Sequence, residues 1–373
     1  MTDFSFSGQK MTFLAEDLML NYTYSYENDD NQSDTCCSGT VCNWDTSRKF
    51  AAVFIPVLYS LALTLGLVGN GLVLAVLWQK RRMWSVTDTF ILHLGVADIL
   101  LLVTLPFWAV EAADEWVFGK GLCKITGAVF KINFYCGIFL LSCISLDRYM
   151  SIVHAVQMYS RRKPWMVQAS CLGVWIFCVL LSVPDLVLLD TYSEPRKGDK
   201  IECIYSFPID TMSEWRQAFR ILYHIVGFLI PATTMVFCYT CILLRLHRGS
   251  QSVQKQRAMR VIMGLVVTFF VCWTPYNIVL IMETANTIKS QNQSVECDTY
   301  TTLDISLTAT TTLGYMHCCL NPVLYAFVGV KFRRHLLELL KSLGCQISRW
   351  VAPVSRKSSV WSDSVDTSNT SAF

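Results

Sequence analysis

The chain has 373 residues, of which 53% are hydrophobic and only 16% are charged, and its formal net charge is +3. Soluble proteins carry about 25% charged residues, and a mean hydropathy of +0.39 is high for a soluble chain. This composition excludes a soluble globular enzyme, a disordered protein and a nucleic-acid-binding protein, and it indicates a polytopic membrane protein.

Residues 1–49 precede the first apolar run and are acidic. They hold eight acidic and three basic residues, a net charge of −5. Polar side chains dominate the rest of the segment, so we expect a disordered N-terminal tail.

Seven runs of 21 to 30 residues, each with at most one charge, follow this tail. A bilayer core of about 30 Å needs about 20 apolar residues in a helix, so each run predicts one membrane-spanning helix. The fold class predicted from them is an all-α membrane protein with a seven-transmembrane helix bundle over residues 50–330. The runs are Phe50–Gln79, Thr89–Val110, Ile125–Leu146, Pro164–Pro184, Ile221–Leu244, Val261–Met282 and Ile305–Val330.

Basic residues gather on one side of these predicted helices. Fifteen Lys and Arg residues lie in the connectors after the first, third and fifth runs and just beyond the seventh. The positive-inside rule makes this side cytoplasmic. We therefore predict a multi-pass plasma-membrane protein with an extracellular N-terminus and a cytoplasmic C-terminus. Sequons at Asn21, Asn31 and Asn292 fall on the outer side and predict N-glycosylation.

Two segments follow the seventh run. Residues 331–345 begin with basic and apolar residues at helical spacing, which predicts a short amphipathic eighth helix on the membrane lipid surface. Residues 346–373 form a cytoplasmic tail rich in Ser and Thr. The tail is either plain solvated chain or a phosphorylation cluster, in which each phosphate adds about −1.5 to −2 charge.

Six of the sixteen cysteines lie on the predicted outer side, where thiols oxidise. A Cys123–Cys203 bond would tie the loop before the fifth run to the start of the third. Closing a loop of about 80 residues stabilises a fold by about 4–5 kcal/mol in the chain-entropy model. Cys297 is predicted to pair with one of three cysteines of the tail, and the sequence leaves the choice open among Cys36, Cys37 and Cys42.

Polar residues inside the predicted membrane helices are candidates for function. A charge at the bilayer centre costs about 2.5–3.5 kcal/mol, so it normally faces the bundle interior and marks a site. The cluster predicts either a sodium site, through Asp98, Asn133, Ser145 and Asn321, or a polar patch that only joins helices. No other cofactor or metal is expected. Asp98 is the charged member, and Asn70, Asn133, Ser145, His317 and Asn321 lie at comparable depths.

Three short motifs combine charge, aromatic rings and proline. An Asp-Arg pair at a helix end can hold its Arg or release it to another partner, and proline kinks a helix by removing a backbone hydrogen bond. Together they predict a conformational switch. The motifs are Asp147-Arg148-Tyr149 at the end of the third run, Trp273-Thr274-Pro275 in the sixth, and Asn321-Pro322 with Tyr325 in the seventh.

The whole chain resembles the rhodopsin-like G-protein-coupled receptors, because seven residues stand in the expected runs: Asn70, Asp98, Arg148, Trp175, Pro231, Pro275 and Pro322. Within that family it is similar to the CXC chemokine receptors. The likeness to chemokine receptors in general rests on Thr104-Leu-Pro106 with Trp108, on the run from Asp147 to Ala155, and on the second outer cysteine pair. Thr311 departs from the pattern, since many chemokine receptors have Glu there.

The resemblance implies a receptor and not an enzyme. It implies binding of basic CXC chemokines and activation of an inhibitory-type heterotrimeric G protein, with calcium signalling and chemotaxis in an immune response as the output. Receptor kinases and arrestin would act on the C-terminal tail. Arg148, Tyr239 and Tyr325 would rearrange as the sixth helix swings outward near Trp273 and Pro275. The alternatives are an atypical scavenging chemokine receptor without G-protein signalling, or a receptor for another peptide.

Charge and aromatic residues indicate where a basic chemokine would bind. The acidic tail would attract it and speed the encounter. Tyrosines beside acidic residues favour tyrosine sulfation; the alternative is that they are only aromatic residues of a disordered arm. The predicted tail residues are Tyr22, Tyr24, Tyr26, Glu27, Asp29 and Asp30.

The mouth of the bundle would receive the basic N-terminus of the chemokine. Acidic residues are predicted as its partners, and an apolar floor is predicted below them. The acidic residues are Glu111, Asp114, Asp185, Glu283 and Asp304, and the floor residues are Trp108, Phe130, Tyr276 and Tyr315.

Overall fold

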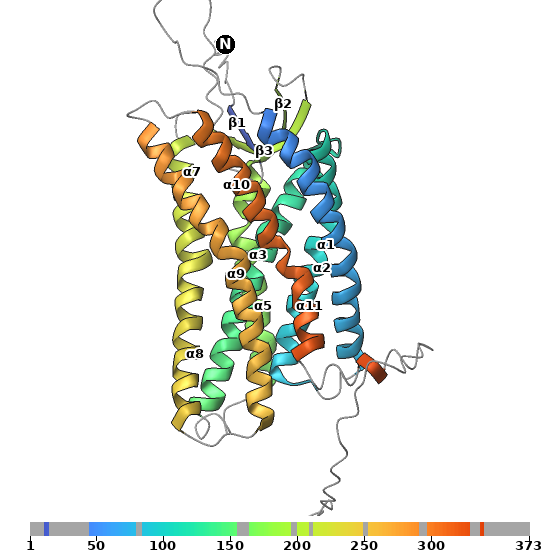
Figure 1. Cartoon of the computed structure of the whole chain (residues 1–373), viewed down its shortest axis with the longest axis vertical. Coiled ribbons are helices and arrows are strands. Elements are labelled where there is room, and N and C mark those ends of the chain that lie inside the picture. The colour runs from blue at the N-terminus through green and yellow to red at the C-terminus, as the bar shows by residue number, and fades with distance from the viewer. Residues whose placement is uncertain are drawn as a thin grey trace, which may run out of the picture.

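The computed structural model describes residues 11–14, 45–79, 84–154, 164–194, 200–208, 212–248, 253–290, 297–328 and 336–338. These residues form a bundle of long helices that carries a small three-stranded sheet at one end (Figure 1). We call this the sheet end, and the end that holds Asp147-Arg148-Tyr149 the opposite end.

The first four crossings of the bundle follow the predicted runs closely. They are α1 (Asp45–Gln79), α2 (Val86–Ala113), α3 (Gly119–Val153), and α5 (Pro164–Leu181) with the short α6 (Val183–Leu188). Helix α2 begins with a capping box, in which Ser85 and Asp88 each bond the backbone N–H of the other. The cap fixes the start of α2 three residues before the predicted run begins.

The fifth and sixth crossings extend further than the predicted runs. The fifth consists of α7 (Met212–Leu222), a π-helical segment η4 (Tyr223–Leu229) and α8 (Ile230–Arg248). Pro231 follows the π segment and removes one N–H from the hydrogen-bond ladder, which favours such a local change of pitch. The sixth crossing is the single helix α9 (Val253–Ser290), which contains Pro275.

The seventh crossing is broken into α10 (Cys297–Tyr315) and α11 (His317–Val328). Six described helical segments are long and apolar enough to span a membrane, and α10 and α11 are not among them. Two features explain this. The seven threonines of α10 lower its hydropathy, and the break at Met316 divides the crossing into two shorter helices. The predicted helix over residues 331–345 is described only at residues 336–338, which are helical.

Large apolar side chains cover the outside of the bundle. Val53, Leu172 and Val271 are each more than 60% exposed in the isolated chain, which suits helices that face lipid. Inside, glycines let helices approach closely. A Cβ atom on Gly69 would lie 2.8 Å from Pro322 Cβ, so α1 and α11 pack at this point with no room for a side chain.

The sheet is a feature that the all-α prediction did not include. Strands β2 (Leu189–Glu194) and β3 (Lys200–Phe207) form an antiparallel hairpin, and β1 (Met11–Leu14) pairs with the other edge of β3. Residues 11–14 belong to the tail that we expected to be disordered, and here they form a strand. The rest of that tail up to residue 44, and the Ser/Thr-rich tail from residue 346, lie outside the described residues.

Candidate functional site

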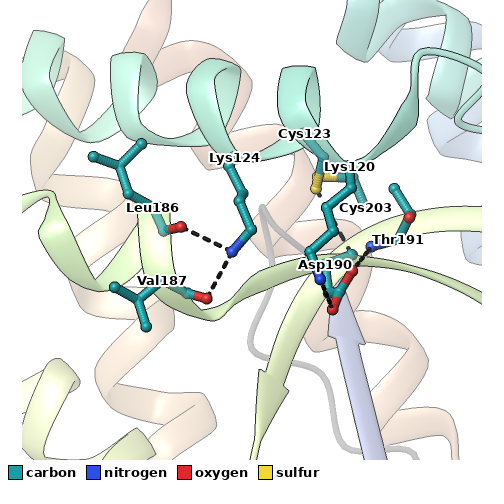
Figure 2. Close-up of polar contacts among 8 residues, drawn as sticks. All are labelled: Lys120, Cys123, Lys124, Leu186, Val187, Asp190, Thr191 and Cys203. Carbon is teal, nitrogen blue, oxygen red and sulfur yellow. Dashed lines mark hydrogen bonds and ion pairs between the residues drawn. A yellow bond between two sulfur atoms is a disulfide. The ribbon is translucent and has the colours of Figure 1, made fainter.

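The β2–β3 hairpin is fastened to the start of α3 by a disulfide and by two lysines (Figure 2). Cys203 of β3 is bonded to Cys123 of α3. Lys120 Nζ lies 2.7 Å from Asp190 Oδ2 of β2. Lys124 Nζ donates to the backbone oxygens of Leu186 (2.8 Å) and Val187 (2.7 Å), just before β2. These contacts hold the hairpin across the sheet end of the bundle.

A small cavity lies inside the bundle at this end. All four predicted floor residues line it: Trp108, Phe130, Tyr276 and Tyr315. Lys131, Phe134, Tyr223, Trp273, Thr311 and Gly127 complete the lining. The cavity measures about 20 Å³, and one water molecule needs about 10–15 Å³ by the same measure. A ligand group larger than this requires the aromatic side chains to move.

The aromatic rings of the lining pack edge to face around Trp273. Its ring lies 4.7 Å from Phe134 and 5.1 Å from Tyr315, measured between centroids. Tyr315 in turn lies 4.4 Å from Phe130 on α3. Each such pair contributes about 0.5–1.5 kcal/mol beyond its buried area. A group that entered the cavity would therefore act directly on the Trp273 ring.

Two of the predicted acidic partners at the mouth already bind groups on the hairpin. Glu111 Oε1 accepts a hydrogen bond from the Cys203 backbone N–H at 2.6 Å. Asp114 Oδ1 lies 2.5 Å from Lys200 Nζ, and the Asp114 side chain is 72% exposed. The first contact helps to anchor β3, and the second is a surface ion pair of small energy.

The deeper acidic residues are also engaged. Glu283 Oε2 of α9 lies 2.5 Å from Arg220 Nη2 of α7, and both side chains are at least 92% buried. Asp185 accepts a hydrogen bond from the Tyr205 hydroxyl, and burial, followed by the Asp185 charge, raises the pKa of Tyr205. Asp304 is buried in α10. A basic ligand must compete with these internal contacts.

A polar cluster lies at the middle of the bundle. Asp98 is fully buried, and its carboxylate accepts hydrogen bonds from Asn133 Nδ2 (3.2 Å) and Asn321 Nδ2 (2.9 Å). His317 Nε2 lies 3.9 Å from the same carboxylate. Asn70 instead donates to the Cys318 backbone oxygen at 2.9 Å. The cluster thus links α2 and α3 to α11, the second half of the broken crossing.

The predicted sodium ligands are only partly brought together. Asp98 offers a buried carboxylate, and Asn133 Oδ1 is a buried oxygen without a hydrogen-bond partner among the described residues, so both suit a cation. Ser145 has its contacts elsewhere: its hydroxyl donates to the Leu141 oxygen (2.7 Å), and its Oγ lies 3.3 Å from the Tyr239 hydroxyl oxygen. The sodium ion and its four ligands stay a prediction.

Arg148 is held internally at the opposite end. Its Nε lies 3.8 Å from Asp147 Oδ2, and its Nη2 donates to Thr87 of α2. The Tyr149 hydroxyl lies 3.1 Å from His154 Nε2. Tyr325 belongs to α11, but its side chain is outside the described residues. Asp147 and Thr87 therefore hold Arg148 inside the protein in this structure.

Several predicted site residues fall outside the description. They are Tyr22, Tyr24, Tyr26, Glu27, Asp29, Asp30, Cys36, Cys37, Cys42, Asn21, Asn31 and Asn292. The backbone of Cys297 is described and its side chain is not, so its pairing stays a prediction. The sequence reading did not name Arg220, which the fifth run excluded because it is charged. Arg216 and Arg220 are four residues apart just before an apolar run, and this spacing would have placed both on one face of an extended helix.

Comparison with known proteins gives a consistent result. The model of the 7 transmembrane receptor (rhodopsin family) matches residues 69–325. Human C-X-C chemokine receptor type 3 is 46% identical over 356 residues, which covers 94% of each chain. The bovine receptor of the same type is 45% identical over 369 residues, covering 97% of this chain and 98% of its own. Mouse C-X-C chemokine receptor type 5 is 43% identical over 298 residues, covering 80% of this chain and 79% of its own.

The type 3 similarity agrees with three stretches of the sequence that resemble that receptor most. They are Pro184-Asp-Leu186, the run from His317 to Arg333, and Ser358-Ser-Val-Trp-Ser362. These stretches lie in different parts of the chain, so the likeness is not confined to one motif.

Proposed function

Since the chain belongs to the chemokine receptors of the rhodopsin family of seven-transmembrane receptors, we propose that it binds basic CXC chemokines at the sheet end and activates an inhibitory-type G protein at the opposite end. The sheet end is extracellular in this proposal, as the positive-inside rule predicts, and the protein lies in the plasma membrane. Chemotaxis and calcium signalling are the proposed outputs.

The observation that supports this most is a continuous series of contacts from the cavity to the middle of the bundle. Trp273 lines the cavity, and its ring centroid lies 5.9 Å from that of His317. His317 lies 3.9 Å from Asp98, and Asp98 binds Asn321 beside Pro322. A ligand that displaced Trp273 would disturb both proline-containing helices, α9 and α11.

The effect at the opposite end follows from the contacts of Arg148. In the proposed active state α9 moves outward, Arg148 leaves Asp147 and Thr87, and its guanidinium contacts the G protein. Reversing a 99:1 balance of inactive to active states requires about 5.5 kcal/mol of differential ligand binding. A chemokine would supply this energy by exchanging internal contacts at the mouth for contacts with itself.

Capture of the ligand would begin at the N-terminal tail. A net charge of −5 over residues 1–49 attracts a basic protein and speeds its association at low salt. Sulfation of Tyr22, Tyr24 and Tyr26 would add to this charge. The tail and the mouth together give the ligand two acidic regions in succession.

The proposal is tested by reconstituting the full chain with an inhibitory-type G protein and adding purified CXC chemokines one at a time. At least one chemokine should accelerate nucleotide exchange, and Arg148→Ala should bind that chemokine with unchanged affinity while exchange is lost. Binding and cellular uptake without exchange would support the scavenging alternative. If no CXC chemokine binds at all, the proposal is wrong.

A further inference from the structure

The cavity at the sheet end is lined by groups that donate hydrogen bonds. Indole N–H groups and the Lys ammonium group can only donate, and Trp108, Trp273 and Lys131 bring three of them. Hydroxyl groups of tyrosines and Thr311 complete the polar lining, and no lining residue has a carboxylate or an amide side chain. Three of the seven polar groups in the lining can therefore only donate, and the four hydroxyls can donate or accept.

Three of these polar atoms are buried and have no hydrogen-bond partner among the residues that the structure describes. A buried donor without a partner costs about 1–3 kcal/mol, so an acceptor placed in the cavity would recover part of this cost. The three atoms are Trp108 Nε1, Trp273 Nε1 and Thr311 Oγ1.

Lys131 places a positive charge beside them. Its Nζ lies 5.4 Å from the centroid of the Tyr223 ring, and it forms no ion pair within 4.0 Å with any described carboxylate. Asp185 acts on it from a longer distance, but an Asp185 oxygen already accepts the Tyr205 hydroxyl. The charge of Lys131 is therefore only partly compensated within the chain.

The cavity lining and the mouth of the bundle differ in charge. Thr311 carries no charge, and its hydroxyl adds a further donor to the lining. The acidic residues of the mouth, Glu111, Asp114 and Glu283, are outside the cavity lining. The floor of the binding site is thus opposite in charge to its rim.

We propose that this cavity is a subsite for an acidic group of the ligand, whose carboxylate binds Lys131, the Trp108 indole N–H and the Thr311 hydroxyl. The inference rests on the proposed function for the identity of the ligand. It adds that the floor of the site binds a carboxylate group of that ligand. The rim receives basic groups of the chemokine, and one carboxylate of its inserted segment reaches the floor. The cavity of about 20 Å³ has room for one small group of this kind before its aromatic walls move.

The subsite is tested first with small probes on the purified full-length receptor. Indole-3-acetate and tryptamine share a ring system and carry opposite charges. We expect indole-3-acetate to raise the unfolding temperature and tryptamine to leave it unchanged. Lys131→Gln should weaken binding of indole-3-acetate about 10- to 100-fold, as expected for the loss of a hydrogen bond to a charged group, and Lys131→Arg should retain it.

Lys124→Gln is the matched control. Lys124 lies two turns before Lys131 on the same helix and binds the Leu186 and Val187 oxygens instead of lining the cavity (Figure 2). This variant should keep the wild-type preference for the carboxylate probe. An equal response of the wild-type receptor to both probes would overturn the proposal, as would an equal loss in the Lys124 and Lys131 variants.

A second experiment changes the ligand itself, and its first readout needs only the wild-type receptor. Any chemokine that activates the receptor is remade with each acidic residue of its N-terminal segment changed to the corresponding amide. One such change should lower potency about 10- to 100-fold on the wild-type receptor and have no further effect on Lys131→Gln. Unchanged potency for every amide variant would refute the subsite. Absence of any activating chemokine would instead refute the proposed function, and the probe experiment would still decide the subsite.

Discussion

The buried ion pair between α7 and α9 gives the sharpest test of how the sheet end is stabilised. Glu283→Gln keeps the shape of the side chain and removes its charge. Arg220 would then keep the hydrogen bond from its Nη1 to Thr284 Oγ1 (2.7 Å) but lose its carboxylate partner. Removing one member of a buried ion pair costs about 3–5 kcal/mol, because the remaining charge is left uncompensated.

The matched control is the exposed pair at the same end. Asp114 and Lys200 also lie 2.5 Å apart, but their side chains are 72% and 37% exposed. Exposed pairs contribute about 0–1 kcal/mol, so Asp114→Asn should change the stability little. The two substitutions remove the same kind of charge at the same distance, and only the burial differs.

Thermal unfolding of the purified receptor with a thiol-reactive fluorescent dye measures both effects. Seven free cysteines of the described chain are buried, among them Cys136, Cys178 and Cys318, and they react when the bundle opens. Glu283→Gln should lower the unfolding temperature clearly below that of Asp114→Asn. Equal temperatures for the two variants would refute the view that burial makes the Arg220–Glu283 pair structurally important.

Two further substitutions test the hairpin and the Trp273 contact. Replacing both Cys123 and Cys203 with Ser should destabilise the fold by up to about 4–5 kcal/mol and should reduce the effect of reductant on the unfolding temperature; the reasoning fails if reductant lowers that temperature equally in the variant and in the wild type. Gly314→Ala places a Cβ 2.9 Å from Trp273 Cε3, so it should cost about 1–3 kcal/mol and alter basal nucleotide exchange. Gly173→Ala, where a Cβ meets nothing within 4 Å, is its control, and identical stability and exchange in these two variants would contradict the prediction.

Hydrophobic runs predicted the bundle well, but they misjudged where helices begin. Met212 starts the fifth crossing nine residues before the run at Ile221, because Arg216 and Arg220 ended the charge-free stretch. Arg220 is tolerated in the helix since Glu283, far along the chain, neutralises it. A rule that counts charges locally cannot anticipate such a partner.

The candidate site was predictable in its aromatic residues and not in its polar contacts. The floor residues Trp108, Phe130, Tyr276 and Tyr315 all line one cavity, because large aromatic side chains at the same depth of a bundle meet at its axis. The internal partners of Glu111, Asp114 and Asp185 lie on the hairpin, whose strands carry no clear alternation in the sequence. Tyr205 therefore gave no signal of its bond to Asp185.

The different burial of the two ion pairs implies an order of events in the proposed mechanism. A basic group of the ligand can displace Lys200 from Asp114 at small cost, because both partners are solvated before and after the exchange. Displacing Arg220 from Glu283 requires α7 and α9 to separate, since both side chains are buried between them. Glu283 lies on the same helix as Trp273 and Pro275, so this second exchange frees the part of α9 that the switch must move. A ligand that reaches only Asp114 should consequently bind without activating, whereas one that also engages Glu283 should do both.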